Sequence, residues 1–215
     1  MLQINDLHVV KEGKKILNGI DLQIDPGEKI VILGESGSGK STLLKSIILF
    51  ETITSGEIKF SGAIIDKLNV SEYRKNFIYI SQKAPQSFSS VKEYICLPFQ
   101  FRRNKRNTPE ESVLKTYLEN FNFASAIMEQ NYNDLSGGEQ QRITIIQALL
   151  INKPIFLLDE ITSNLDKKNV SRVVEQILSE RARSVIYVTH DTDNLDKFDK
   201  IYRLADGLVR QEVAR

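Results

Sequence analysis

The feature that most restricts the fold of this 215-residue chain is a glycine-rich loop between an apolar run and a helix-forming run. Residues 30–33 read Ile-Val-Ile-Leu, a pattern typical of a buried strand. The loop that follows fits the pattern G-x4-G-K-[ST], and its residues are Gly34, Glu35, Ser36, Gly37, Ser38, Gly39, Lys40, Ser41 and Thr42. A strand, this loop and a helix in that order predict a nucleoside triphosphate site in an α/β fold.

Each residue type in the loop has a physical task. Glycines let the backbone curl so that successive N–H groups point at phosphate oxygens. Lys40 adds a charge that reaches the β- and γ-phosphates, and the Ser41 hydroxyl is a ligand for Mg²⁺. The dinucleotide pattern G-x-G-x-x-G is not matched, which disfavours a nicotinamide enzyme. We therefore expect ATP and Mg²⁺ as cofactors.

Composition limits the class of protein. Lys plus Arg total 29 against 28 for Asp plus Glu, and a net charge of +1 argues against nucleic acid as a partner. No apolar run exceeds four residues, so no membrane span is expected, and the first residues do not resemble a signal peptide. One cysteine, Cys96, and two histidines leave no Cys/His zinc site. We expect a cytoplasmic protein.

Strand and helix patterns predict one α/β domain. Predicted strands cover residues 2–10, 20–24, 30–33, 57–60, 77–81, 155–158, 185–189 and 200–204. Predicted helices cover residues 40–50, 109–121, 137–150 and 169–182. Alternation in the second half predicts a largely parallel sheet covered by helices. Residues 83–134 have helical patterning and predict a lobe inserted into a core of residues 1–82 and 135–215.

An acidic pair follows a second buried-type strand. Residues 155–158 are apolar, and Asp159 and Glu160 come directly after them. Asp159 is predicted to hold the metal at the carboxyl edge of the sheet, and Glu160 to act as general base for water. Two solvated acids at a strand end are the plainer interpretation, and the phosphate loop makes it the weaker one.

A second anion site is predicted at Ser136, Gly137, Gly138 and Glu139, which precede a helical run to residue 150. A hydroxyl and backbone N–H groups at a helix N-terminus favour a phosphate. One chain cannot easily place both sites on one γ-phosphate, so two chains arranged head to tail are expected. The alternative is a Gly-Gly turn that only caps the helix.

With these motifs the chain resembles the nucleotide-binding subunits of ABC transporters. Further matches are Gln82 at the Q-loop position, Asp166 in Ser-Asn-Leu-Asp at the D-loop, and His190 after the strand 185–189. The resemblance implies that Gln82 contacts Mg²⁺ and is catalytic, and that His190 contacts the γ-phosphate and water. Ser136 to Glu139 and Asp166 would meet ATP in trans.

The resemblance also implies the fold, the partners and the location. The fold would be a P-loop NTPase core of RecA type, with an N-terminal antiparallel β part and an inserted helical lobe. The partners would be a second copy of the chain and an integral membrane permease. The chain would lie at the inner face of the cell membrane.

Two departures from the family pattern concern the nucleotide preference of the chain and its subgroup within the family. Many relatives have an aromatic residue that stacks on adenine where this chain has Val10 or Lys11, so we expect modest ATP affinity and poor discrimination against GTP. Ile161 replaces the proline of most relatives. Because of Ile161 and residues 97–102, the chain resembles the iron-export ATPases of FetA/YbbL type.

Two alternatives to a transporter subunit remain open from the sequence. A soluble ABC ATPase for cofactor or cluster assembly also fits 215 residues and commonly lacks the adenine aromatic. A degenerate nucleotide-binding scaffold is disfavoured because Lys40, Asp159, Glu160 and His190 are all present.

Overall fold

The computed structural model describes residues 1–82, 88–102, 104–105 and 108–212, and the predicted start of the inserted lobe at 83–87 lies outside these residues. The chain forms two compact units. The first contains Met1–Tyr79, Lys153–Glu160 and Glu180–Arg215, and the second contains Ile80–Asn152 and Ile161–Ser179.

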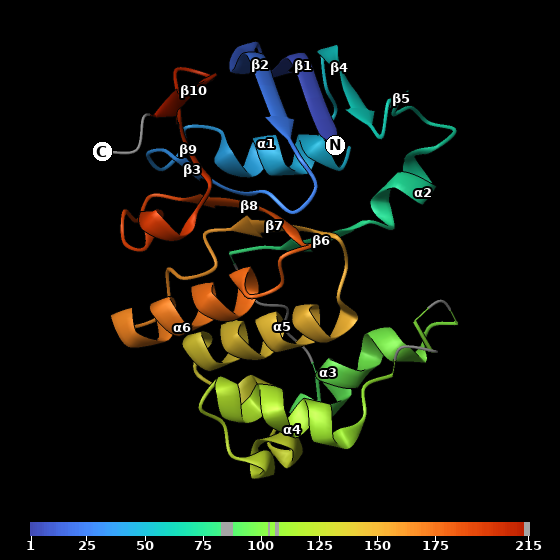
Figure 1. Cartoon of the computed structure of the whole chain (residues 1–215), viewed down its shortest axis with the longest axis vertical. Coiled ribbons are helices and arrows are strands. Elements are labelled where there is room, and N and C mark those ends of the chain that lie inside the picture. Colours follow the sequence, from blue (N-terminus) through green and yellow to red (C-terminus); the bar gives the residue numbers. More distant parts are fainter. Residues whose placement is uncertain (83–87, 103, 106–107, 213–215) are drawn as a thin grey trace. The chain divides into compact units, whose positions relative to one another are not determined.

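The first unit contains two sheets (Figure 1). Among the described residues, sheet A has the order β2 (Lys14–Ile24), β1 (Leu2–Lys11), β4 (Ser55–Phe60) and β5 (Ala63–Ile64), and its paired strands are antiparallel. Sheet B has the order β10 (Leu208–Glu212), β9 (Lys200–Ala205), β3 (Lys29–Leu33), β8 (Ser184–Thr189), β7 (Ile155–Asp159) and β6 (Phe77–Ile80). Strands β9, β3, β8 and β7 are parallel, while β10 is antiparallel to β9. The predicted α/β class with an N-terminal antiparallel part is confirmed.

Helix α1 (Lys40–Ile47) lies between the two sheets, as Figure 1 shows. Its residues Leu43, Leu44 and Ile47 are buried in one core with side chains of β1, β2, β3, β7 and β8. Strands β3 and β7 are buried at every position, which explains their uninterrupted apolar sequences. Burial on both faces holds the carboxyl ends of these strands in fixed positions.

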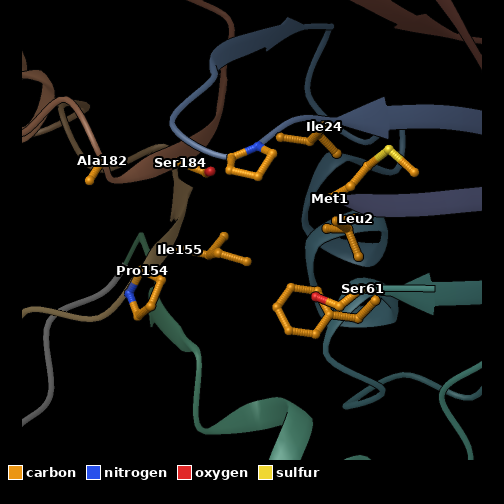
Figure 2. Close-up of a pocket in the computed structure, with 10 residues that line it drawn as sticks. Met1, Leu2, Ile24, Ser61, Pro154, Ile155, Ala182 and Ser184 are labelled. Atoms are coloured by element: carbon orange, nitrogen blue, oxygen red, sulfur yellow. The ribbon is translucent and has the colours of Figure 1, made fainter. Parts of the chain in front are cut away.

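A small apolar pocket of about 170 Å³ opens in the first unit (Figure 2). Its lining comes from the start of β1, the ends of β2 and β4, and the starts of β7 and β8. The residues are Met1, Leu2, Ile24, Pro26, Phe60, Ser61, Pro154, Ile155, Ala182 and Ser184. Because β7 and β8 begin here, the pocket lies at the edge of sheet B opposite to the phosphate loop.

The second unit is helical. It contains α3 (Val91–Gln100), α4 (Glu111–Asn120), η2 (Ser125–Glu129), η3 (Tyr132–Asp134), α5 (Gly137–Ile151) and α6 (Lys167–Leu178). Helix α5 contacts α3, α4 and α6. Two tyrosines support this packing, because the hydroxyl groups of Tyr94 and Tyr132 lie 3.1 and 3.5 Å from the Thr144 hydroxyl of α5. No helix in the described ranges is both long and apolar enough to cross a bilayer.

The two units divide the chain differently from the predicted core and lobe. The prediction assigned residues 135–215 to the core, but 135–152 and 161–179 group with the lobe helices. The reason is that α5 makes its contacts with α3, α4 and α6 inside the second unit. The predicted boundaries between core and lobe, at 82/83 and 134/135, stay a prediction.

Several elements were not predicted from the sequence. They are the first half of β2, β5, α2 (Val70–Arg74), η4 (Leu195–Lys197) and β10. The lobe was predicted to be helical, but α3, η2 and η3 within it had no predicted bounds. The longer predicted elements agree with the structure to within a few residues at each end.

Candidate active site

The candidate site of the first unit lies at the carboxyl edge of sheet B. Strands β3, β8 and β7 are neighbours and parallel, so their last residues share one edge. The phosphate loop follows β3, and His190 follows β8. Asp159 is the last residue of β7, and Glu160 comes directly after it. This edge is where open α/β sheets bind ligands.

The phosphate loop tolerates few side chains. A Cβ atom on Gly34 would lie 2.6 Å from the Ser38 Oγ and 2.8 Å from the Leu204 carbonyl oxygen. Gly39 has a φ of +102°, which a residue with a side chain rarely adopts. Among the residues that the structure describes, the Ser38 hydroxyl is buried without a hydrogen-bond partner. A buried donor without a partner fits a loop that binds an anion.

Lys40 lies inside this loop and is only 4% exposed. Its Nζ donates to the carbonyl oxygens of Gly34 and Glu35, each at 2.8 Å. It also forms an ion pair with Glu160, whose Oε1 lies 3.0 Å away. The ammonium group is thus fixed beside both the loop backbone and the predicted general base.

Glu160 connects Lys40 to His190. Its other carboxylate oxygen, Oε2, lies 3.5 Å from the Nδ1 of His190. The backbone of Glu160 has a φ of +48°, an uncommon conformation for a residue with a side chain, and strain of this kind concentrates at functional sites. His190 is 60% exposed in its side chain, so its imidazole is accessible to a ligand.

Asp159 accepts one hydrogen bond on each carboxylate oxygen. Ser41 Oγ donates to Oδ1 at 2.8 Å, and the Tyr79 hydroxyl donates to Oδ2 at 2.8 Å. Burial, together with the hydrogen bond and charge of Asp159, raises the pKa of Tyr79 well above its usual value. Tyr79 therefore stays protonated and acts as a donor.

Ser41 and Asp159 fit a magnesium ion. Both offer oxygen atoms, and Mg²⁺ prefers one or two protein oxygens completed by water and substrate phosphates. Within the described part of the chain, no cluster of three or more His, Cys, Asp or Glu residues could hold a metal alone.

A pocket of about 420 Å³ opens beside the phosphate loop. It is lined by residues 34–38 of the loop and by residues 203–206 at the end of β9 and just after it. Arg203 in this wall pairs with Glu212 of β10 at 2.5 Å. No sequence pattern predicts that the segment 203–206 lies beside the loop.

The second unit carries the predicted trans site at the start of α5. Ser136 is the residue before the helix, and its Oγ accepts from the backbone N–H of Glu139 at 3.4 Å. In return, the Glu139 carboxylate accepts from the backbone N–H of Ser136 at 2.9 Å and from its hydroxyl at 2.6 Å. These hydrogen bonds with Ser136 lower the pKa of Glu139. The arrangement is a capping box, which fixes the first turn of the helix.

The predicted trans residues line one pocket of about 430 Å³. It is lined by Ser136, Gly137, Gly138, Glu139, Arg142, Asn164, Leu165, Asp166 and Asn169. Asp166 begins α6 and accepts from the backbone and side chain of Asn169, which lowers the pKa of Asp166. A Cβ atom on Gly138 would lie 2.8 Å from the backbone carbonyl oxygen of Asn164, so a side chain does not fit there.

The structure thus groups the predicted residues in two sets. The first unit brings together Lys40, Ser41, Asp159, Glu160 and His190. The second unit brings Ser136 to Glu139 together with Asp166. Gln82 belongs to the second unit and is exposed, so its predicted contact with Mg²⁺ stays a prediction. The sequence reasoning missed Tyr79 and, in the second pocket, Asn169.

Val10 and Lys11 stand where many relatives have an aromatic residue, and both lie at the end of β1. Val10 is 41% exposed at the end of β1. Lys11 beside it pairs with Glu51 at 2.5 Å. Neither side chain offers a π face to a base.

Comparison with known families gives a match over most of the chain. The sequence model described as "ABC transporter" matches residues 17–163. This segment includes the phosphate loop, the residues Ser136 to Glu139, and the acidic pair Asp159 and Glu160.

Two curated relatives match over most of their own length. The chain is 34% identical to the "Probable iron export ATP-binding protein FetA" of Escherichia coli (strain K12), over 100% of this chain and 96% of that protein. It is 35% identical to the "Lipoprotein-releasing system ATP-binding protein LolD" of Pseudoalteromonas translucida (strain TAC 125), over 89% of this chain and 85% of that protein.

A solved structure has the same fold. It is the dimeric structure of a post-hydrolysis state of the ATP-binding cassette MJ0796 bound to ADP and Pi. The TM-score is 0.83 and the sequence identity 28%, over 100% of this chain and 99% of the other.

Proposed function

Because this chain belongs to the ABC transporter family and is an ATPase of that family, we propose that it dimerises around two Mg–ATP to power a separate membrane permease. The observation that carries this proposal is the set of contacts Lys40–Glu160–His190 beside Ser41–Asp159. At the carboxyl edge of sheet B it combines a cation for the phosphates, a base next to a histidine, and an oxygen pair for a metal.

The contacts support a division of tasks in hydrolysis. Glu160 would orient and deprotonate the attacking water, and its carboxylate is held between Lys40 and His190 for this purpose. Lys40 would turn from the loop carbonyls to the phosphate oxygens, where its charge offsets theirs. When bound through Ser41 and Asp159, Mg²⁺ supplies further positive charge to the phosphates.

The trans site supports a dimer with shared nucleotides. Ser136, Gly137 and Gly138 present a helix N-terminus to a pocket of about 430 Å³, which would receive the γ-phosphate held by the partner's phosphate loop. The dimeric structures of the ATP-binding cassette MJ0796 support dimerisation.

A Gly137→Asp variant tests the trans site. A Cβ at Gly137 would meet only the Asn164 Nδ2 at 3.9 Å, so a side chain fits there. An aspartate in the first turn favours the helix by about 0.3–1 kcal/mol. A γ-phosphate ~4 Å away would be repelled by roughly 4 kcal/mol. We expect an unchanged or higher thermal midpoint and loss of the ATP-dependent dimer, measured by size-exclusion chromatography in the Glu160→Gln background.

The matched control for this experiment is Gly137→Asn, which has the same size and no charge. It should keep most of the dimer that Glu160→Gln accumulates with ATP. Equal amounts of dimer for the Asp and Asn variants would show that no phosphate reaches the start of α5.

We propose iron export as the transport process and the inner face of the cell membrane as the location. The supporting observation is the 34% identity to an iron export ATP-binding protein over the whole chain. The test is purification of the tagged chain from membranes. A multi-span membrane protein should co-purify with it, and iron should accumulate in cells that carry Glu160→Gln. A chain that co-purifies only with soluble assembly proteins would favour the cofactor-assembly alternative.

We also propose weak selectivity for adenine, because Val10 and Lys11 stand where relatives have an aromatic residue. Titrations with ATP and GTP should give dissociation constants within about threefold of each other. A Val10→Tyr variant should bind ATP roughly tenfold more tightly, since stacking on a base contributes about 1–3 kcal/mol. Tight, strongly ATP-selective binding by the parent chain would contradict this proposal.

A further inference from the structure

Tyr79 is a polar contact of the site that no motif accounts for. It lies on β6, and its hydroxyl donates to the Asp159 Oδ2 at 2.8 Å. Asp159 is 4% exposed, so few water molecules can replace this donor. The other oxygen of the same carboxylate, Oδ1, accepts from Ser41. Tyr79 and Ser41 therefore hold Asp159 from its two oxygens.

Two donors fix the plane of the carboxylate. The terminal torsion of an aspartate is broad, so packing alone defines the direction of its oxygens poorly. Each carboxylate oxygen offers two lone pairs, and one remains free on each after the two hydrogen bonds are made. Without Tyr79, only the bond from Ser41 would restrict rotation of the carboxylate. Ser41 is itself a predicted ligand of the metal.

We propose that Tyr79 is a positioning residue that orients Asp159 for Mg²⁺ and so sets the metal affinity of the site. This inference rests on the proposed function, because it assumes that Ser41 and Asp159 hold the metal. It assigns Tyr79 no contact with the nucleotide. Loss of its hydroxyl should therefore weaken the response to Mg²⁺ and leave metal-free nucleotide binding unchanged.

The first unit offers a matched control. Tyr73 of α2 is also buried, and its hydroxyl donates to the backbone carbonyl of Ile47 at 2.8 Å. Tyr73→Phe and Tyr79→Phe each remove one hydroxyl and one hydrogen bond from the same unit. Only Tyr79→Phe removes a donor to Asp159.

The experiment measures nucleotide affinity by titration in EDTA and across a series of Mg²⁺ concentrations. For Tyr79→Phe we expect the EDTA dissociation constant to stay within about twofold. The Mg²⁺ concentration for half of the affinity gain should rise about tenfold, a typical cost of losing a partner of a metal ligand. Tyr73→Phe should lower the thermal midpoint without moving the Mg²⁺ requirement.

A double variant separates positioning from structural support. In an Asp159→Asn background the oriented carboxylate is gone, so Tyr79→Phe should cause no further change in the Mg²⁺ requirement. An unchanged Mg²⁺ requirement in the single Tyr79→Phe variant, or equal shifts in both tyrosine variants, would overturn the inference. Absence of any Mg²⁺ effect in the parent chain would instead overturn the proposed function.

Discussion

A Glu160→Gln variant should bind Mg–ATP with near-parent affinity and hydrolyse it at least about a hundredfold more slowly, as expected when a general base is lost. Glutamine keeps the size of the side chain and can still accept from Lys40, whose Nζ lies 3.0 Å from the carboxylate. It cannot take a proton from water. With hydrolysis blocked, ATP should stay bound and dimers should accumulate.

Steady-state phosphate release and size-exclusion chromatography with ATP measure the two parts of this result. Glu72→Gln is the control, because it also removes a carboxylate that pairs with a lysine of the first unit, Lys75. It should hydrolyse ATP at the parent rate. Turnover by Glu160→Gln at near the parent rate would show that Glu160 is not the base.

The second large effect is expected for a Lys40→Met variant. Its ATP affinity should fall roughly a hundredfold, which corresponds to about 3 kcal/mol of binding free energy. Without Lys40, the phosphates lose a buried cation, and the Gly34 and Glu35 carbonyls each lose one donor. The Glu160 carboxylate, 16% exposed, also loses its nearest counter-charge. The thermal midpoint without nucleotide should therefore fall as well.

Thermal unfolding with and without ATP measures both effects, since a bound ligand raises the midpoint. Lys45→Met, a lysine exposed in the last turn of α1, is the control and should keep the ATP-induced rise. The double variant Lys40→Met/Glu160→Gln should recover part of the stability, because the carboxylate that lost its lysine partner is removed too. A full ATP-induced rise in Lys40→Met would contradict the assigned role.

The sequence predicted those parts of the site that depend on local patterns. The phosphate loop is recognisable from consecutive residues, and β7 from four apolar residues before Asp159. The resemblance to ABC transporter subunits of FetA type is confirmed by the family match and the 34% identity. Tyr79 could not be found this way, because its partner Asp159 lies 80 residues away and neither neighbour of Tyr79 signals a polar contact.

Irregular and short elements explain most of the remaining differences. Gly19 breaks the apolar pattern of β2, and the structure places it at a φ of +86° where the pairing of β1 and β2 shifts register. The grouping of α5 with the lobe helices also could not be predicted from the sequence. Ile143, Ile145 and Ile146 are all buried and do not form one stripe, so their spacing does not tell which neighbours cover the helix.

The position of β8 in its sheet has a consequence for synthesis of the protein. This strand, Ser184–Thr189, lies between β3 and β7, yet it is made after both of them. Until the ribosome has released it, β3 and β7 have no shared neighbour, and Asp159 cannot be held beside Ser41. At about 5–20 residues per second, the nascent chain spends many seconds with its phosphate loop exposed and incomplete. ATP can therefore assist folding of the complete site only after β8 has been made.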